Sequence, residues 1–164
     1  LTGANLSGAR LSNADLSQSE LTGADLSNAE LYNTQLIGAN LSEANLAGAD
    51  LQKAQLTNTN LHRANLTSAW LASAQLQDAN LSQANLFKST LNSANLQDAD
   101  LSQANLMEAS LIKANLQDVD LQDADLNKTI LFKASVSKAA LIEAQLCLTS
   151  LPNYTMHGRD CDRT

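Results

Sequence analysis

Leucine recurs at every fifth position from Leu1 to Leu151, with Val136 as the exception. Two residues before each leucine stands alanine in most units, and Ser, Thr or Val in the others. A step of five residues advances about 500° around an α-helix, so the leucines would form no apolar stripe there. In an extended chain, residues two apart face the same side, so each Ala-x-Leu unit turns both apolar side chains inward. The pattern therefore predicts short extended segments joined by corners.

Longer echoes in the sequence indicate how many units complete one coil. LTGANLS at 1–7 returns as LTGADLS at 21–27, LSQANL at 81–86 returns at 101–106, and ANLQDAD at 94–100 returns as ANLQDVD at 114–120. The echoes are twenty residues apart, although LQDAD at 121–125 breaks them. Four units per coil predict a four-sided coil, with successive coils stacked about 4.8 Å apart. In this register Lys88, Glu108 and Lys128 are vertical neighbours of alternating charge.

The units ANLSG at 4–8, ADLSN at 24–28 and ANLQD at 94–98 share the pattern A(D/N)Lxx. This pattern resembles the pentapeptide-repeat family over nearly the whole chain. The resemblance implies an all-β fold, a right-handed quadrilateral parallel β-helix with four pentapeptides per coil and about seven coils. We expect residues 1–149 to form this solenoid and residues 150–164 to form a C-terminal cap.

The composition favours a thin core over a thick globular one, since 44% of the residues are hydrophobic but only 3% are aromatic. There is no run of about eighteen apolar residues, so we expect no membrane insertion. The formal net charge of −7 argues against direct binding of nucleic acid and against adhesion to anionic membranes. We expect no cofactor.

The tail from Cys147 to Thr164 holds both cysteines and the only proline. We expect its apolar side chains to cover the open end of the coil: Leu148, Leu151, Tyr154 and Met156. A disulfide between Cys147 and Cys161 is the favoured interpretation, because it would close a short loop in an otherwise cysteine-free chain. Two free thiols are one alternative. A metal site is the other, from Cys147, His157, Cys161 and Asp160 or Asp162, but no CxxC spacing supports it.

Catalysis is not expected from any motif in the chain. No G-x-S-x-G, P-loop or HExxH occurs, and no serine stands with a histidine and a carboxylate in a recognisable arrangement. His62 lies at a corner position beside Arg63, without a cysteine or a second histidine nearby in sequence. We expect a solvated surface histidine there.

Two outward surfaces are candidates for contact with other molecules. The first is an acidic ridge, in which the twenty-residue register stacks five carboxylates around one corner: Asp78, Asp98, Asp100, Asp118 and Asp120. It serves solubility, or it binds a divalent cation such as Ca²⁺ or a basic partner. The second is an apolar patch of four outward side chains: Trp70, Ile112, Ile130 and Phe132. Exposed apolar patches mark contacts, so we expect a homodimer or cover by the tail.

The family resemblance leaves two classes of function. The favoured class is a non-catalytic structural or protein-binding protein of the kind abundant in cyanobacteria and plastids, with an unknown partner. The alternative is a DNA-mimicking rod that binds DNA gyrase or another topoisomerase. That branch commonly carries phenylalanine at central repeat positions, which this repeat lacks, and the lysines at 88, 113, 128, 133 and 138 interrupt its acidity.

The disulfide-capped members that the tail resembles are often placed in the thylakoid lumen or the periplasm. We therefore expect an oxidising compartment for this chain. The chain starts at Leu1, already in register and without an initiator methionine, so we expect that a leader or an N-terminal cap once preceded it.

Overall fold

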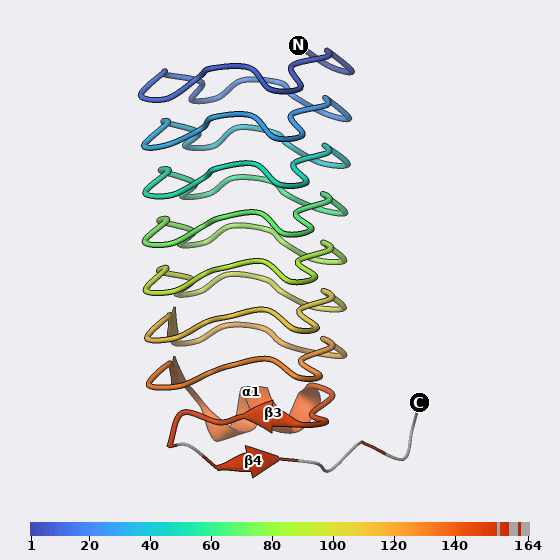
Figure 1. Ribbon diagram of the computed structural model, residues 1–164, viewed down its shortest axis with the longest axis vertical. Coiled ribbons are helices and arrows are strands. Elements are labelled where there is room, and N and C mark those ends of the chain that lie inside the picture. The colour runs from blue at the N-terminus through green and yellow to red at the C-terminus, as the bar shows by residue number, and fades with distance from the viewer. Residues whose placement is uncertain (154, 158–160, 162–164) are drawn as a thin grey trace.

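The computed structural model describes residues 1–153, 155–157 and 161. The chain winds into a rod of stacked coils that runs from the N-terminus to a terminal segment containing α1, β3 and β4 (Figure 1). Parallel bridges join residues twenty apart, from Asn5 with Asp25 to Ile130 with Ser150. The twenty-residue period that the echoes predict is therefore present, and each coil contains four five-residue units.

The corners explain why Asn or Asp so often precedes the leucine. At one representative corner, the Asn80 Oδ1 accepts the N–H of Ser82 at 3.0 Å, and the Leu81 carbonyl accepts the N–H of Ala84 at 3.0 Å. The residue between them, Gln83, has a φ of 58°, and the same left-handed conformation recurs at the matching corner position along the rod. A short Asn or Asp side chain accepts a hydrogen bond from a backbone N–H of the turn. The A(D/N)Lxx pattern therefore predicts the corners as well as the core.

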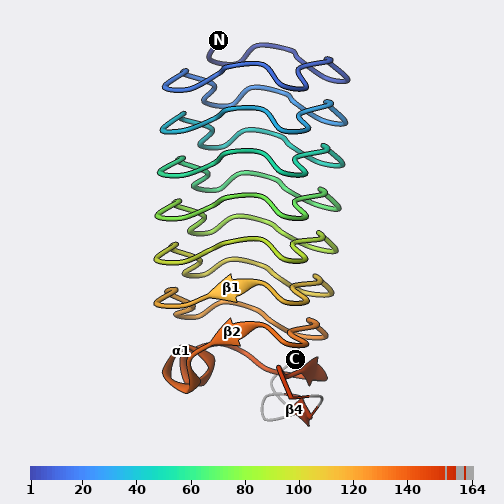
Figure 2. The same ribbon diagram turned by 90° about the vertical axis from the view of Figure 1, so that its left-hand side faces the viewer.

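Most sides contribute one bridging residue per coil, so regular strands are short in the described part of the chain. Strand β1 spans Asn115–Leu116 and pairs in parallel with β2, Ser135–Val136 (Figure 2). Strand β3 spans Thr149–Ser150 and pairs antiparallel with β4, Met156–His157. Helix α1 spans Lys138–Glu143.

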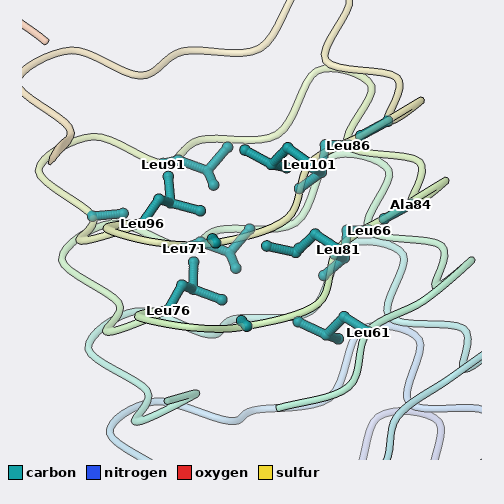
Figure 3. Close-up of a cluster of buried hydrophobic side chains, with 14 of the residues drawn as sticks. Leu61, Leu66, Leu71, Leu76, Leu81, Ala84, Leu86, Leu91, Leu96 and Leu101 are labelled. Carbon is teal, nitrogen blue, oxygen red and sulfur yellow. The ribbon is translucent and has the colours of Figure 1, made fainter. Parts of the chain in front are cut away.

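The core consists of leucine columns that stack along the rod, one for each side of the coil (Figure 3). Leu86 is 0% exposed, and the alanines two residues before the leucines line the same interior. Each buried leucine contributes roughly 1.5–3 kcal/mol. Where threonine replaces alanine, its hydroxyl stays satisfied, because Thr34 and Thr59 donate to the carbonyls of Leu11 and Leu36 at 2.8 Å.

Helix α1 differs from the uninterrupted solenoid that was expected up to residue 149, and it makes the fold not strictly all-β. The Ser137 Oγ accepts the N–H of Ala140 at 3.1 Å and caps a segment, KAALIE, of mostly good helix formers. Ala140 is buried, and Leu141 packs against the core. The bridge ladder resumes at Gln145 and Ser150, so the helix replaces one side of a coil.

The expected apolar cap is wrong in part. Leu151 packs against the core, but Leu148 and Met156 are 52% and 63% exposed. Near this end the buried Ala140 and the half-buried Leu141 of α1 pack against the core instead. Tyr154 lies outside the described residues. No helix in the described part of the chain has the length and hydropathy needed to cross a membrane.

Candidate functional site

The acidic ridge follows the coil register. The N–H of Asp78 donates to the Gln97 carbonyl at 3.1 Å, and that of Asp98 to the Gln117 carbonyl at 3.0 Å, which places the Asp78, Asp98 and Asp118 corners one above another. Asp100 and Asp120 form a parallel bridge on the adjoining side. All five aspartates are exposed or half-buried. The ridge is thus two neighbouring columns of solvent-facing carboxylates.

The carboxylates of these two columns do not converge on one point where they could bind a cation. In residues 1–153, 155–157 and 161, no group of three or more His, Cys, Asp or Glu side chains is placed to hold a metal ion. One Asp100 oxygen already accepts the N–H of Ser102 at 2.8 Å, and one Asp120 oxygen accepts that of Gln122 at 2.8 Å. The geometry therefore gives the calcium hypothesis no support, and the hypothesis of a basic partner remains a prediction.

The lower part of the ridge borders a hollow of about 370 Å³, lined by Gln117, Asp118 and residues 135–137. It forms where the chain leaves the ladder after Val136 and enters α1. The hollow is thus a consequence of the break in the repeat.

A second charged column confirms the register directly. Glu108 lies 3.6 Å from the Lys88 Nζ and 3.7 Å from the Lys128 Nζ, so one carboxylate pairs with the lysines of the coils above and below. These are exposed pairs of modest energy. Their importance is geometric, because they show that one carboxylate faces the coils above and below it, on a different corner from the acidic ridge.

The apolar patch is two separate features. Trp70 and Ile130 are 57% and 41% exposed and share a bridge ladder, but Thr90 and Ser110 stand between them. Three coil steps of about 4.8 Å separate the two side chains by roughly 14 Å. The grouping of all four residues in one patch is therefore wrong, because a shared column does not imply adjacent coils.

Three of the four residues lie in two adjacent coils, and we call Ile112, Ile130 and Phe132 the lower apolar cluster. The N–H of Leu111 donates to the Ile130 carbonyl at 2.8 Å, so the coil of Ile112 lies directly on the coil of Ile130 and Phe132. Ile112 and Phe132 are half-buried. The Lys133 Nζ lies 5.1 Å from the centre of the Phe132 ring, which gives the cluster a cationic edge.

Cys147 and Cys161 form a disulfide with a Cα–Cα distance of 4.7 Å. Bonded sulfurs are not thiolates, so this form of the protein has no cysteine ligands for the alternative metal site. Two other members of that proposed site, Asp160 and Asp162, lie outside the described residues. The bond ties the chain beyond β4 to the last part of the ladder, where the Cys147 N–H donates to the Asn127 Oδ1 at 2.7 Å.

The structure brings together one pair that sequence reasoning missed. The His62 Nδ1 lies 2.9 Å from the Ser82 Oγ, and this hydroxyl donates to the Asn80 Oδ1 at 2.6 Å. Ser82 is no activated nucleophile, because its proton is directed at an amide oxygen. The neighbouring N–H groups of Ser82 and Gln83 are already bonded to Asn80 and Ser102, so they offer no oxyanion site. His62 and Ser82 are twenty residues apart in sequence, so the predicted register of twenty residues already places them in adjacent coils.

Local hydrogen bonds shift the titration of three exposed groups. The side chain and backbone N–H of Ser17 lower the pKa of Asp15, and those of Ser27 lower the pKa of Asp25. A hydrogen bond with Tyr32 raises the pKa of Lys53, whose Nζ lies 5.3 Å from the centre of that ring. All three shifts favour the charged forms, so these groups stabilise corners and side-chain pairs and are not poised for proton transfer near neutral pH.

The family profile described as Pentapeptide repeats matches the chain over the segments 1–36, 34–71, 71–111, 89–127 and 109–146, with eight copies. These matches together span residues 1–146 of the 164-residue chain. The chain has no significant match among the curated proteins.

Several solved structures resemble the chain. HetL, a pentapeptide repeat protein involved in heterocyst differentiation regulation in the cyanobacterium Nostoc, is 33% identical, covers 96% of this chain and 89% of its own, and has a TM-score of 0.48. A pentapeptide repeat protein from the Arabidopsis thaliana thylakoid lumen is 28% identical over 74% of this chain and 71% of its own, with a TM-score of 0.52. Trypsin-treated QnrB1, a plasmid-mediated fluoroquinolone resistance protein, is 21% identical over 88% and 78%, with a TM-score of 0.61, which shows a common fold alone.

Proposed function

We propose that this chain, which belongs to the pentapeptide-repeat family, is a non-catalytic structural or protein-binding rod. In this proposal the rod is a right-handed quadrilateral β-helix of about seven coils, residues 1–149, with a cap at 150–164. The observation that carries the proposal is the filled interior. Because leucine and alanine occupy the inside of the coil, the side chains available to other molecules are those of the outward columns.

The acidic ridge is the contact that we propose for a basic protein partner. Its carboxylates repeat at coil spacing on a backbone that is hydrogen-bonded to the coils above and below. A rigid array lowers the entropy that binding must overcome, and its charge directs a basic partner to one corner of the rod.

We further propose that the lower apolar cluster is the contact in a homodimer, because it combines three apolar side chains with a cationic edge at Lys133. An oxidising compartment is supported by the Cys147–Cys161 bond and by the thylakoid-lumen location of the Arabidopsis relative.

Substitution of the ridge tests the binding proposal. A tagged full-length chain is used to capture proteins from an extract of its source cells, beside a variant that carries Asp98→Asn and Asp118→Asn. Asparagine keeps the shape and tolerates the φ values of 58° and 54° at these positions, so only the charge changes. We expect at least a fivefold loss in recovery of the partner, measured by quantitative mass spectrometry.

The matched control is Gln83→Ala with Gln103→Ala, an exposed neutral pair in two stacked coils on another corner. It should recover the partner as the unmodified chain does, and all three proteins should have the same melting temperature. Equal recovery by the ridge variant, or no protein above the background of the matrix, would contradict binding through the ridge.

The acidic ridge and the net charge of −7 also favour the second candidate, a DNA-mimicking rod that binds gyrase. The neutralised column at Lys88, Glu108 and Lys128 argues against it, because lysines interrupt the acidity of the rod there. A gyrase supercoiling assay separates the candidates. Our proposal predicts no inhibition, whereas inhibition that the ridge variant loses would favour the DNA mimic.

A further inference from the structure

Trp70 is the single tryptophan of the chain, and 57% of it is exposed on the outer surface of the rod. It borders a hollow of about 250 Å³ that is also lined by Gln52, Ala72 and Thr90. This hollow lies on the outside of a filled rod, where the leucine-packed interior leads one to expect a flat side. A large exposed aromatic group beside a cavity is the type of anchor on which binding energy concentrates.

The hollow exists because a short side chain stands in a column of longer ones. The N–H of Lys53 donates to the Ala72 carbonyl at 3.0 Å, so Ala72 lies one coil below Gln52. In the next coil the same column holds Asn92. Trp70 and Thr90, its bridge partner in the following coil, also line the hollow. The backbone around the hollow is fixed by the ladder on both sides, so the cavity is preorganised.

The residues that line the hollow are uncharged, but the column above Trp70 is acidic. Parallel bridges place Glu30 and Asp50 in the two coils above Trp70, in its own column. Glu30 pairs with Arg10 at 3.6 Å, whereas Asp50 uses one oxygen to accept the N–H of Gln52 at 3.0 Å, and within the described residues its other oxygen accepts no hydrogen bond. The nearby cation, Lys53, lies over the Tyr32 ring of the coil above and so is directed away from Ala72.

We infer that Trp70, Asp50 and the hollow at Ala72 form a recognition point for an arginine side chain of a partner protein. The aliphatic stem of the arginine fills the hollow, its guanidinium plane stacks on the indole, and its N–H groups donate to the free Asp50 oxygen. Gln52 and Thr90 offer polar atoms to the partner backbone at the rim. The inference rests on the proposed protein-binding function and adds a further contact, on the same bridge ladder as Ile130 of the lower apolar cluster but three coils above it.

The single tryptophan makes the test direct, because both the fluorescence and the indole N–H resonance of the protein report on Trp70 alone. The full chain is titrated with the blocked tripeptide acetyl-Gly-Arg-Gly-amide and with its norleucine counterpart, which has an apolar side chain without the charge. We expect a saturable change with arginine, with a Kd of about 1–10 mM for this single contact, and at least fivefold weaker binding of norleucine.

Two variants locate the binding. Ala72→Leu fills the hollow, and Asp50→Asn removes the charge while it keeps the acceptor for the Gln52 N–H. Each should raise the Kd at least fivefold at an unchanged melting temperature. Gln97→Leu, at the same corner position on another side of the rod, should leave the Kd unchanged.

The inference is overturned if arginine changes neither the fluorescence nor the indole resonance, if norleucine binds equally well, or if Ala72→Leu and Asp50→Asn bind arginine like the unmodified chain. These failures are distinct from failure of the proposed function. Capture that depends on the acidic ridge would survive a negative arginine titration, and arginine binding at Trp70 would survive a negative ridge experiment.

Discussion

Replacement of Leu86 by alanine is expected to lower the free energy of unfolding by about 2–5 kcal/mol. Leu86 is 0% exposed and stacks between Leu66 and Leu106 in the same column. The backbone around it is hydrogen-bonded to the coils above and below, so the structure cannot collapse into the space that the missing methyl groups leave. Urea unfolding followed by circular dichroism measures the loss.

The exposed side chain of Gln83, three residues before Leu86, provides the comparison. Gln83→Ala removes one exposed hydrogen bond from Arg63 and should cost less than about 0.5 kcal/mol. Similar losses for Leu86→Ala and Gln83→Ala would show that the leucine column is not the core.

Removal of the disulfide is expected to cost about 3 kcal/mol, the value that the chain-entropy argument gives for a loop of roughly fifteen residues. The bond joins cysteines 14 residues apart. The double variant with Cys147→Ser and Cys161→Ser avoids a leftover thiol, and its urea unfolding is compared with that of the unmodified chain. Because the loop lies at the end of the rod, the loss should appear with little change in the circular dichroism of the folded protein.

The state of the two cysteines is checked independently by thiol labelling. The unreduced, denatured chain should take up no label, and the reduced chain should take up two. Two labels without reduction would remove both the bond and the argument for an oxidising compartment.

Most of the fold follows from two features of the sequence. The five-residue leucine spacing excludes a helical core, and the twenty-residue echoes fix which residues stack. The ion pairs of Glu108 with Lys88 and Lys128 confirm this register at the level of side chains. Regular chemistry at each corner makes such a prediction possible, because every unit repeats the same local hydrogen bonds.

Helix α1 was not predicted, because the five-residue leucine spacing continues through its segment. Leu141 and Leu146 keep the five-residue register, whereas the helix depends on the Ser137 cap and on a run of helix formers. The cap preference of one serine is weak against a repeat of this length. Val136, the exception among the leucines, immediately precedes this cap.

The candidate surfaces were predicted less well than the fold, since the register gives columns but not side-chain directions. The twenty-residue register stacks Ala72 below Gln52, but the hollow also depends on where the Trp70 indole lies, which the register does not give. The twenty-residue register could have predicted the pair of His62 and Ser82. It was missed because sequence motifs were sought only among residues close together in the chain.

The stacking of residues twenty apart underlies every surface discussed above, and engineered cysteines test it most directly. Gln83 and Gln103 occupy the same corner in successive coils, at a spacing of about 4.8 Å that lies within the Cα–Cα range of disulfides. Gln83→Cys with Gln103→Cys should oxidise in air and leave no free thiol. Gln83→Cys with Asp98→Cys, a pair only fifteen residues apart but on different corners, should keep two free thiols. Oxidation of the second pair in preference to the first would contradict the account.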